Sequence, residues 1–296
     1  MKNRIQQKFP TLPGFNPRGN PGSEEDVMIN RIKQKFVELK KWQKKAFIAY
    51  IAAGDPNLGT TVELVKAFDQ AGVDIVELGV PFSDPLADGT TIQMASQRAL
   101  KQGVTINKIL QIVQRIRQTS QIPIALMTYY NPIFHYGLAA FLKKARQAGV
   151  DGVIVPDLPP EEGQDLIREA KKFDLATVFF ISPTTQVHRM ARIAKASTGF
   201  VYYVSVTGIT GARQILPKEL IENIKKAKRL TDKPICVGFG VSTPEQVKQL
   251  SQAADGVIVG SAIIKQIEKH RGKKDLIKSV SRFVQELAKP LRTHER

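Results

Sequence analysis

The chain has 296 residues, of which 42% are hydrophobic, and a formal net charge of +17. This length is ample for one large core, and α/β barrels commonly reach it as a single domain. One cysteine, Cys236, excludes an intrachain disulfide framework and fits a reducing compartment. No apolar run approaches the roughly 18 residues of a membrane span, so a membrane protein is not expected.

The positive charge is concentrated at the two ends of the chain. Residues 1–45 carry eleven Lys and Arg against four acidic residues, and residues 265–296 carry ten against four. Aromatic residues do not alternate with these basic residues, as a stacking surface for nucleic acid requires. We interpret the charge as a solvated lysine-rich surface with no specific nucleic-acid partner. An acidic partner surface and an anionic substrate are the alternatives.

Residues 1–24 are rich in Pro, Gly and Asn, which predicts a flexible N-terminal leader. The leader lacks the apolar region of a secretory signal. It is basic and free of acids over its first 22 residues, as in a transit peptide, but it is poor in serine and has no amphipathic stripe. The expected location is the cytoplasm, with the plastid stroma as the alternative. The expected division is leader 1–24, barrel domain 25–290 and C-terminal tail 291–296.

After the leader, an acidic triplet at 24–26 precedes a helical pattern that runs to about Trp42, an extra N-terminal helix. From there, short apolar runs alternate with amphipathic helical patterns. The expected strands lie within 46–53, 73–80, 122–129, 151–158, 176–181, 199–206, 234–240 and 255–262. The expected helices are 60–71, 91–102, 105–118, 138–148, 161–172, 186–195, 217–229, 243–252, 262–270 and 275–288.

The apolar runs are continuous rather than alternating, which is typical of parallel strands buried on both faces. Eight units of strand and helix predict an α/β fold, a single closed (β/α)₈ TIM barrel. The alternative is an open doubly wound sheet, which usually has about six strands and a GxGxxG motif after the first. The first strand here runs instead into AAGDP, so we favour the barrel.

In such a barrel the reactive side chains lie where the strands end. No lysine lies inside an expected strand and no histidine follows one, which argues against a Schiff-base mechanism and against a catalytic metal. Carboxylates and tyrosines are left, and these indicate acid–base chemistry.

Glu77 is the most informative residue, because it interrupts the apolar run VDIVELGV. A carboxyl group in a dry barrel mouth is expected to hold its proton near neutral pH. The alternative is a structural glutamate paired with a neighbouring backbone group or hydroxyl. Asp84 and Asp88 follow on the loop PFSDPLADG, where each also fits an ordinary turn residue.

Glycines follow three of the later strands and would converge in a barrel. Loops after strands 7 and 8, together with a helix N-terminus, form the usual phosphate site of this fold. The loop TGITGAR after strand 6 is expected to act as a lid. The predicted phosphate-binding residues are Gly211, Gly238, Gly240, Gly260 and Ser261.

Several segments together resemble the α subunit of tryptophan synthase: GDP, ELGVPFSDPLADG, the IQ pair at 92–93, MTYYNP, VTGITG, GFG and the final GS. The resemblance covers about residues 28–290, and PFSDPLADG is very specific to this family. It implies a lyase of tryptophan biosynthesis, an aromatic amino-acid pathway, that cleaves indole-3-glycerol phosphate to indole and glyceraldehyde 3-phosphate by acid–base retro-aldol chemistry.

The resemblance also implies roles for individual residues. Glu77 matches the general acid–base residue that protonates the indole C3 carbon. Asp88 matches the aspartate that accepts the indole N–H hydrogen bond and stabilises the ring cation. Tyr202 matches an active-site tyrosine. The substrate ring and lid positions are Tyr50, Phe239 and Thr210, the last of which touches the catalytic aspartate.

The implied partner is a β subunit that carries pyridoxal phosphate, in an α₂β₂ heterotetramer, whereas this chain itself needs no cofactor and no metal. Two alternatives are a stand-alone lyase that releases indole and a non-catalytic activator of a partner subunit. The second predicts loss of Glu77 or Asp88, and both are present. Another phosphate-binding barrel would share the glycines but not PFSDPLADG.

Overall fold

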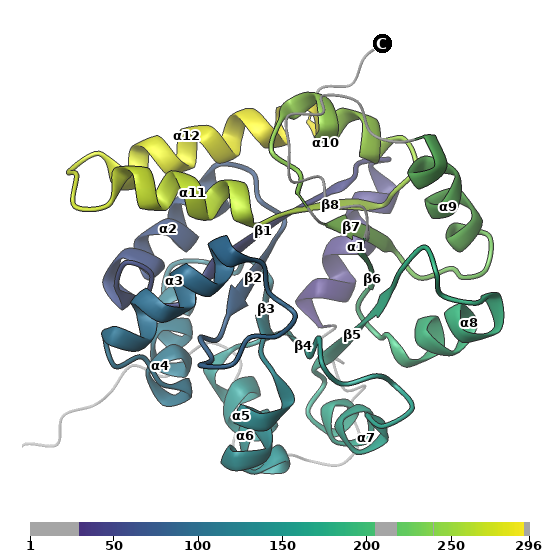
Figure 1. The fold of residues 1–296 in the computed structure, drawn as a ribbon, viewed down its shortest axis with the longest axis horizontal. Coiled ribbons are helices and arrows are strands. Elements are labelled where there is room, and N and C mark those ends of the chain that lie inside the picture. Colours follow the sequence, from purple (N-terminus) through teal and green to yellow (C-terminus); the bar gives the residue numbers. More distant parts are fainter. Residues whose placement is uncertain (1–29, 205–217, 239, 293–296) are drawn as a thin grey trace, which may run out of the picture.

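The computed structural model describes residues 30–204, 218–238 and 240–292. Within these residues, eight parallel strands pair in chain order and close into a barrel surrounded by helices, which confirms the predicted fold (Figure 1). Each predicted apolar run contains one strand. The strands are β1 Ala46–Ala52, β2 Ile75–Gly79, β3 Ile124–Met127, β4 Gly152–Ile154, β5 Ala176–Ile181, β6 Val201–Val204, β7 Ile235–Gly238 and β8 Gly256–Val259.

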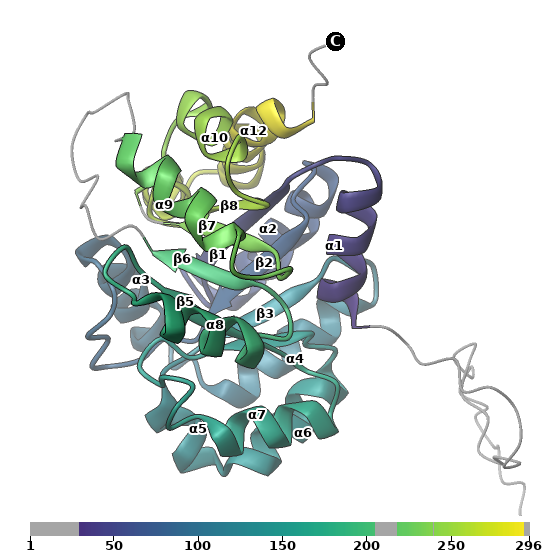
Figure 2. The same cartoon turned by 90° about the vertical axis from the view of Figure 1, so that its right-hand side faces the viewer.

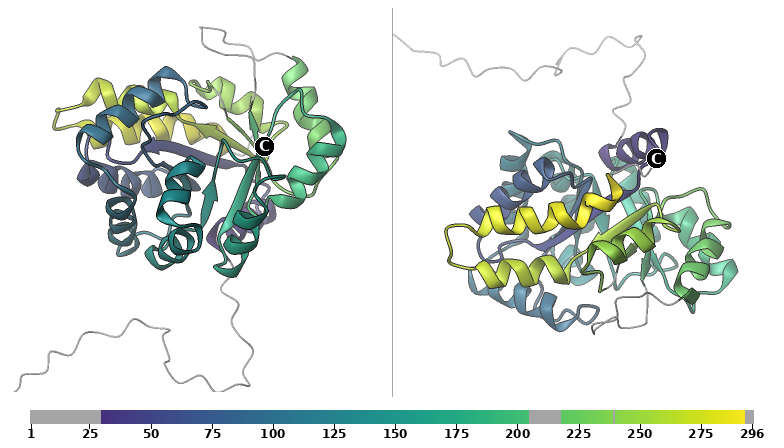
Figure 3. Two further views of the ribbon diagram at one scale, coloured as in Figure 1. Left: turned by 60° about the horizontal axis from the view of Figure 1, so that its bottom comes forward. Right: turned by 90° about the horizontal axis from the view of Figure 1, so that it is seen from above.

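The helices follow the predicted alternation with the strands. On one side of the barrel α11 and α12 pack side by side, and α12 also packs against α2 (Figure 3). None of the described helices is long and apolar enough to cross a membrane. The helices are α1 Arg31–Lys41, α2 Leu58–Gln70, α3 Thr90–Lys101, α4 Ile106–Arg117, α5 Tyr130–Tyr136, α6 Leu138–Ala148, α7 Gln164–Lys172, α8 Val187–Ala196, α9 Lys218–Lys228, α10 Pro244–Ser251, α11 Ser261–His270, α12 Leu276–Ala288 and the 3₁₀ turn η1 Lys289–Leu291.

Two helices differ from the prediction. Helix α1 begins at Arg31, later than the acidic triplet suggested, because the Asn30 side chain accepts hydrogen bonds from the N–H groups of Ile32 and Lys33 and caps the helix there. Helix α5 was not predicted. It follows β3 directly and has Pro132 in its first turn, where a missing N–H costs no helical hydrogen bond.

Helix α1 closes the end of the barrel at which the strands begin (Figure 2). Its buried face, Ile32, Phe36 and Leu39, belongs to the same apolar cluster as the interior residues of the strands. A Cβ atom on Gly152, at the start of β4, would lie 2.9 Å from the Ile32 side chain. The glycine therefore allows the helix to approach the strand ends closely.

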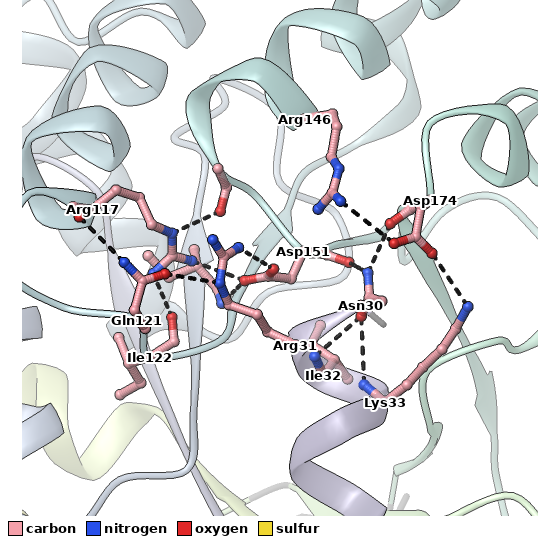
Figure 4. Close-up of polar contacts among 12 residues, drawn as sticks. Asn30, Arg31, Ile32, Lys33, Arg117, Gln121, Ile122, Arg146, Asp151 and Asp174 are labelled. Atoms are coloured by element: carbon pink, nitrogen blue, oxygen red, sulfur yellow. Dashed lines mark hydrogen bonds and ion pairs between the residues drawn. The ribbon is translucent and has the colours of Figure 1, made fainter. Parts of the chain in front are cut away.

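A polar cluster fixes α1 in this position (Figure 4). Asp151, just before β4, accepts hydrogen bonds from Arg31 at 2.7 Å, from Arg117 at 2.8 Å and from the Ile124 N–H at 2.9 Å. The Asn30 amide donates to the Asp151 carbonyl at 2.6 Å. Arg31 of α1 and Arg117 of α4 thus balance the buried charge of Asp151. The other end of the barrel, where the strands end, remains available for a functional site.

Candidate active site

Glu77 is the middle residue of the five-residue strand β2, paired in register with Tyr50 of β1 and Ala125 of β3. Its side chain is fully buried, and neither carboxylate oxygen has a hydrogen-bond partner among the described residues. Burial raises the pKa of Glu77 to about 8, because the charged form loses its hydration. The side chain therefore carries a proton at neutral pH. The partner that a purely structural glutamate requires is not found in the described part of the chain.

Asp88 lies on the loop between β2 and α3, two residues before the helix begins. The side chain is half-buried. Burial raises its pKa to about 6, and a hydrogen bond with the Tyr129 side chain acts in the opposite direction. Asp88 is therefore mostly ionised at neutral pH while Glu77 is mostly protonated. Two carboxyl groups held in opposite states are the arrangement that general acid catalysis with charge stabilisation requires.

Tyr129 holds the loop that carries Asp88. Its hydroxyl accepts a hydrogen bond from the Ala87 N–H at 2.9 Å, and its ring packs on Phe82 at a centroid distance of 5.3 Å. From the other side, the Gln93 amide donates to the Asp88 carbonyl at 2.9 Å. The sequence placed Tyr129 at the exit of the third strand but offered no signal for this role.

The two tyrosines predicted for the site pack against its glycines. A Cβ atom on Gly238 of β7 would lie 2.5 Å from the Tyr202 hydroxyl, and one on Gly260 would lie 3.2 Å from the Tyr50 ring. Both tyrosines are buried, which raises their pKa well above the usual value, so both are neutral hydrogen-bond donors. Gly238 and Gly260 therefore leave space for the rings of Tyr202 and Tyr50. From the sequence, these glycines were predicted only as phosphate-binding residues, and this packing was not predicted.

The start of α11 has the features of an anion site. Gly260 is its N-cap, Ser261 is its first residue, and its first turn contains no acidic residue. The first N–H groups of a helix lack acceptors within the helix and attract negative charge. Gly240 lies beyond β7 with φ +74°, a backbone conformation that favours glycine. Gly211, Thr210 and Phe239 lie outside the described residues.

Within residues 30–204, 218–238 and 240–292, no group of three or more His, Cys, Asp or Glu side chains could hold a metal ion. The Asp55 side chain, which follows β1, is not free. Its carboxylate instead pairs with Arg98 of α3 through two hydrogen bonds of 2.8 Å.

The family model described as "Tryptophan synthase alpha chain" matches residues 36–292. The tryptophan synthase alpha chain of Geobacter sp. (strain M21) is 47% identical over 259 residues, which cover 88% of this chain and 97% of that relative. The tryptophan synthase alpha chain of Thermoanaerobacter sp. (strain X514) is 46% identical over 263 residues, which cover 89% and 100%.

Solved structures show the same similarity. Tryptophan synthase subunit alpha from Legionella pneumophila str. Paris matches with a TM-score of 0.83 and 38% identity over 89% of this chain and 98% of that chain. A chain in a structure of the tryptophan synthase a2b2 complex from Pyrococcus furiosus matches with a TM-score of 0.79 and 41% identity, over 83% and 99%. Sequence and fold agree along most of the chain, which belongs to the tryptophan synthase alpha chain family.

Proposed function

We propose that this chain cleaves indole-3-glycerol phosphate to indole and glyceraldehyde 3-phosphate, with Glu77 as general acid and Asp88 as the stabilising carboxylate. The observation that carries the proposal is the contrast between these two groups. Glu77 is fully buried without a hydrogen-bond partner in the described residues, whereas Asp88 is half-buried and hydrogen-bonded to Tyr129. Family membership suggests the substrate, and this contrast supports the two proposed roles.

The reaction needs the indole ring to become a leaving group. Protonation of the ring at C3 by Glu77 produces a cation that can accept the electron pair of the carbon–carbon bond. Asp88 accepts the hydrogen bond of the indole N–H, where the positive charge develops. Loss of the proton from the neighbouring hydroxyl then gives the aldehyde as the bond breaks. Glu77 is a carboxylate after it has donated its proton, so it can accept that proton and return to its starting state.

The other end of the substrate is a phosphate dianion. The N-terminus of α11, with Ser261, and the backbone at Gly238, Gly240 and Gly260 are the proposed anchor, together with Gly211. Tyr202 of β6 and Tyr50 of β1 are proposed to contact the substrate, and the family resemblance adds Phe239 and Thr210 as proposed ring and lid residues. An anchored phosphate positions the indole ring at the acid without covalent chemistry.

A β subunit is the proposed partner, because the matching Pyrococcus furiosus chain belongs to an a2b2 complex. Leu86 on the Asp88 loop is 94% exposed, and Phe134 of α5 is 68% exposed. Both apolar side chains follow the C-terminal ends of strands, so a partner that covers this face would receive indole directly. Pyridoxal phosphate would belong to that partner, in an α₂β₂ assembly, and the proposed step in this chain uses no cofactor.

The bacterial relatives favour a cytoplasmic location over the plastid stroma. We propose residues 25–290 as the barrel domain, with 1–24 as leader and 291–296 as tail. The buried Leu291 and the ion pair of Arg292 with Asp74 extend the packing by two residues.

The test is to mix the purified full-length chain with indole-3-glycerol phosphate and measure released indole, with and without a β subunit. We expect indole in both cases and faster release with the partner. Equal rates in the two cases would indicate a stand-alone lyase. No indole under either condition would overturn the proposed function.

A further inference from the structure

A partly buried ion-pair network joins the two helices that begin at the proposed site. Arg98 of α3 binds both oxygens of Asp55 at 2.8 Å through Nε and Nη2, and its Nη1 donates to Glu268 of α11 at 3.0 Å. The Arg98 side chain is 16% exposed and that of Asp55 2%, whereas that of Glu268 is 39% exposed. A guanidinium with three shared hydrogen bonds in a shielded position has a strongly restricted geometry.

The two helices also share an apolar contact on the same side of the barrel (Figure 1). Ala95 of α3 and Ile264 of α11 belong to one buried cluster with Tyr50 and Ala52 of β1. Ala95 and Arg98 are three residues apart, and Ile264 and Glu268 are four apart, so each pair lies on one face of its helix. Arg98 and Glu268 therefore join the two helices at points farther along each helix than the apolar contact of Ala95 and Ile264.

Each helix carries a different half of the site at its N-terminus. Helix α3 begins two residues after Asp88, which is proposed to bind the indole nitrogen. Helix α11 begins at Ser261, which is proposed to bind the phosphate. The third member, Asp55, belongs to the loop after β1, whose Gly54 N–H is bonded to the Thr61 hydroxyl at 2.9 Å. The spacing of the two helices therefore sets the distance between the two ends of the substrate site.

We infer that Arg98 is a positioning residue. It holds the indole-binding and phosphate-binding halves of the site at the separation that the substrate requires, an inference that rests on the proposed function. Arg98 does not touch the substrate itself. Its loss leaves each half able to bind its own group, but it removes the fixed spacing. A ligand that contains both an indole ring and a phosphate then binds less tightly, because the two halves of the site are no longer held at the distance that matches its length.

The experiment measures three ligands on the full-length chain and on Arg98→Ala. The ligands are indole, inorganic phosphate, and an unreactive analogue in which a propyl chain joins the indole ring to a phosphate. For the variant we expect the affinity for indole and for phosphate to change by less than about twofold, and that for the joined analogue to fall about 10-fold. The kcat/KM for cleavage should fall about 10- to 100-fold, with Arg98→Lys in between.

The matched control is Arg292→Ala, which removes another arginine that pairs with a largely buried aspartate, Asp74, near the start of β2. It should lower the unfolding temperature without changing the affinity for the joined analogue. If Arg98→Ala does not fold, Glu268→Gln decides, because it weakens only the contact between the helices, and it should show the same pattern to a smaller extent. Equal losses for all three ligands, or no loss for the analogue, would overturn the inference. Absence of turnover in the unmodified chain would instead count against the proposed function.

Discussion

Two fully buried carboxyl groups of the same barrel, Glu77 within β2 and Asp151 just before β4, have opposite surroundings. Asp151 accepts hydrogen bonds from Arg31, Arg117 and the Ile124 N–H (Figure 4). Glu77 has no partner for either oxygen in the described part of the chain. A paired buried charge contributes to a defined structure, whereas a buried carboxyl group without a partner costs stability and is retained where its proton is used. The comparison separates a carboxyl group that holds α1 in place from the one that is proposed to supply a proton.

The strongest test of this contrast is Glu77→Gln. The amide has nearly the same shape but cannot donate a proton to carbon, so indole release should fall about 10²- to 10⁴-fold. Binding of the joined indole–phosphate analogue should be largely retained, as titration would show. Turnover close to that of the unmodified chain would remove Glu77 from the mechanism.

Asp151→Asn should have the opposite profile. The change leaves the guanidinium of Arg117, only 10% exposed, without its counter-charge, and Arg31 also loses its partner. We expect the free energy of unfolding in urea to fall by about 3 to 5 kcal/mol. The kcat of the folded fraction at low temperature should be unchanged, since the Asp151 side chain is bonded to Arg31, Arg117 and the Ile124 N–H and to none of the proposed substrate-binding residues. A large loss of kcat with normal stability would contradict the division of the barrel into two ends.

The pH dependence of stability should also distinguish the two acids. The pKa of Glu77 is raised from 4.5 to about 8 in the folded chain, so the folded state binds more protons than the unfolded state between these values. Its stabilising contribution is complete below about pH 4.5 and is lost as the pH rises toward 8. Glu77→Gln should therefore be as stable as the unmodified chain at pH 4 and more stable at pH 8, as thermal unfolding at both values would reveal. Equal stability at pH 8 would mean that the buried carboxyl has no raised pKa.

The smallest expected effect concerns Tyr129, which supports Asp88. The active form needs Asp88 ionised, with pKa about 6, and Glu77 protonated, with pKa about 8, so kcat/KM should be greatest between these values. Tyr129→Phe removes a hydrogen bond that lowers the pKa of Asp88. The acid limb of the profile should therefore move up by less than about one pH unit, while the alkaline limb stays in place. Movement of both limbs together would indicate a general change of the site.

The sequence was sufficient for the order of the elements because each apolar run is long enough to form one strand and too continuous to be half-exposed. It was less informative at element ends. Helix α5 was missed because MTYYNP continues an apolar run with no cap signal ahead of it, and the start of α1 depends on the Asn30 side chain rather than on the acidic triplet. Both are local choices between conformations of similar free energy.

The sequence by itself determined that a barrel would form and that Glu77 would be inside it, since a lone carboxylate in a strand buried on both faces has no route to solvent. It could not determine which groups would neutralise the buried acids. Arg117 and Asp151 are 34 residues apart, and Arg31 and Asp151 are 120 residues apart. Only closure of the barrel brings such groups within hydrogen-bond distance, and therefore only the tertiary structure decided that Asp151 is paired while Glu77 is left with its proton.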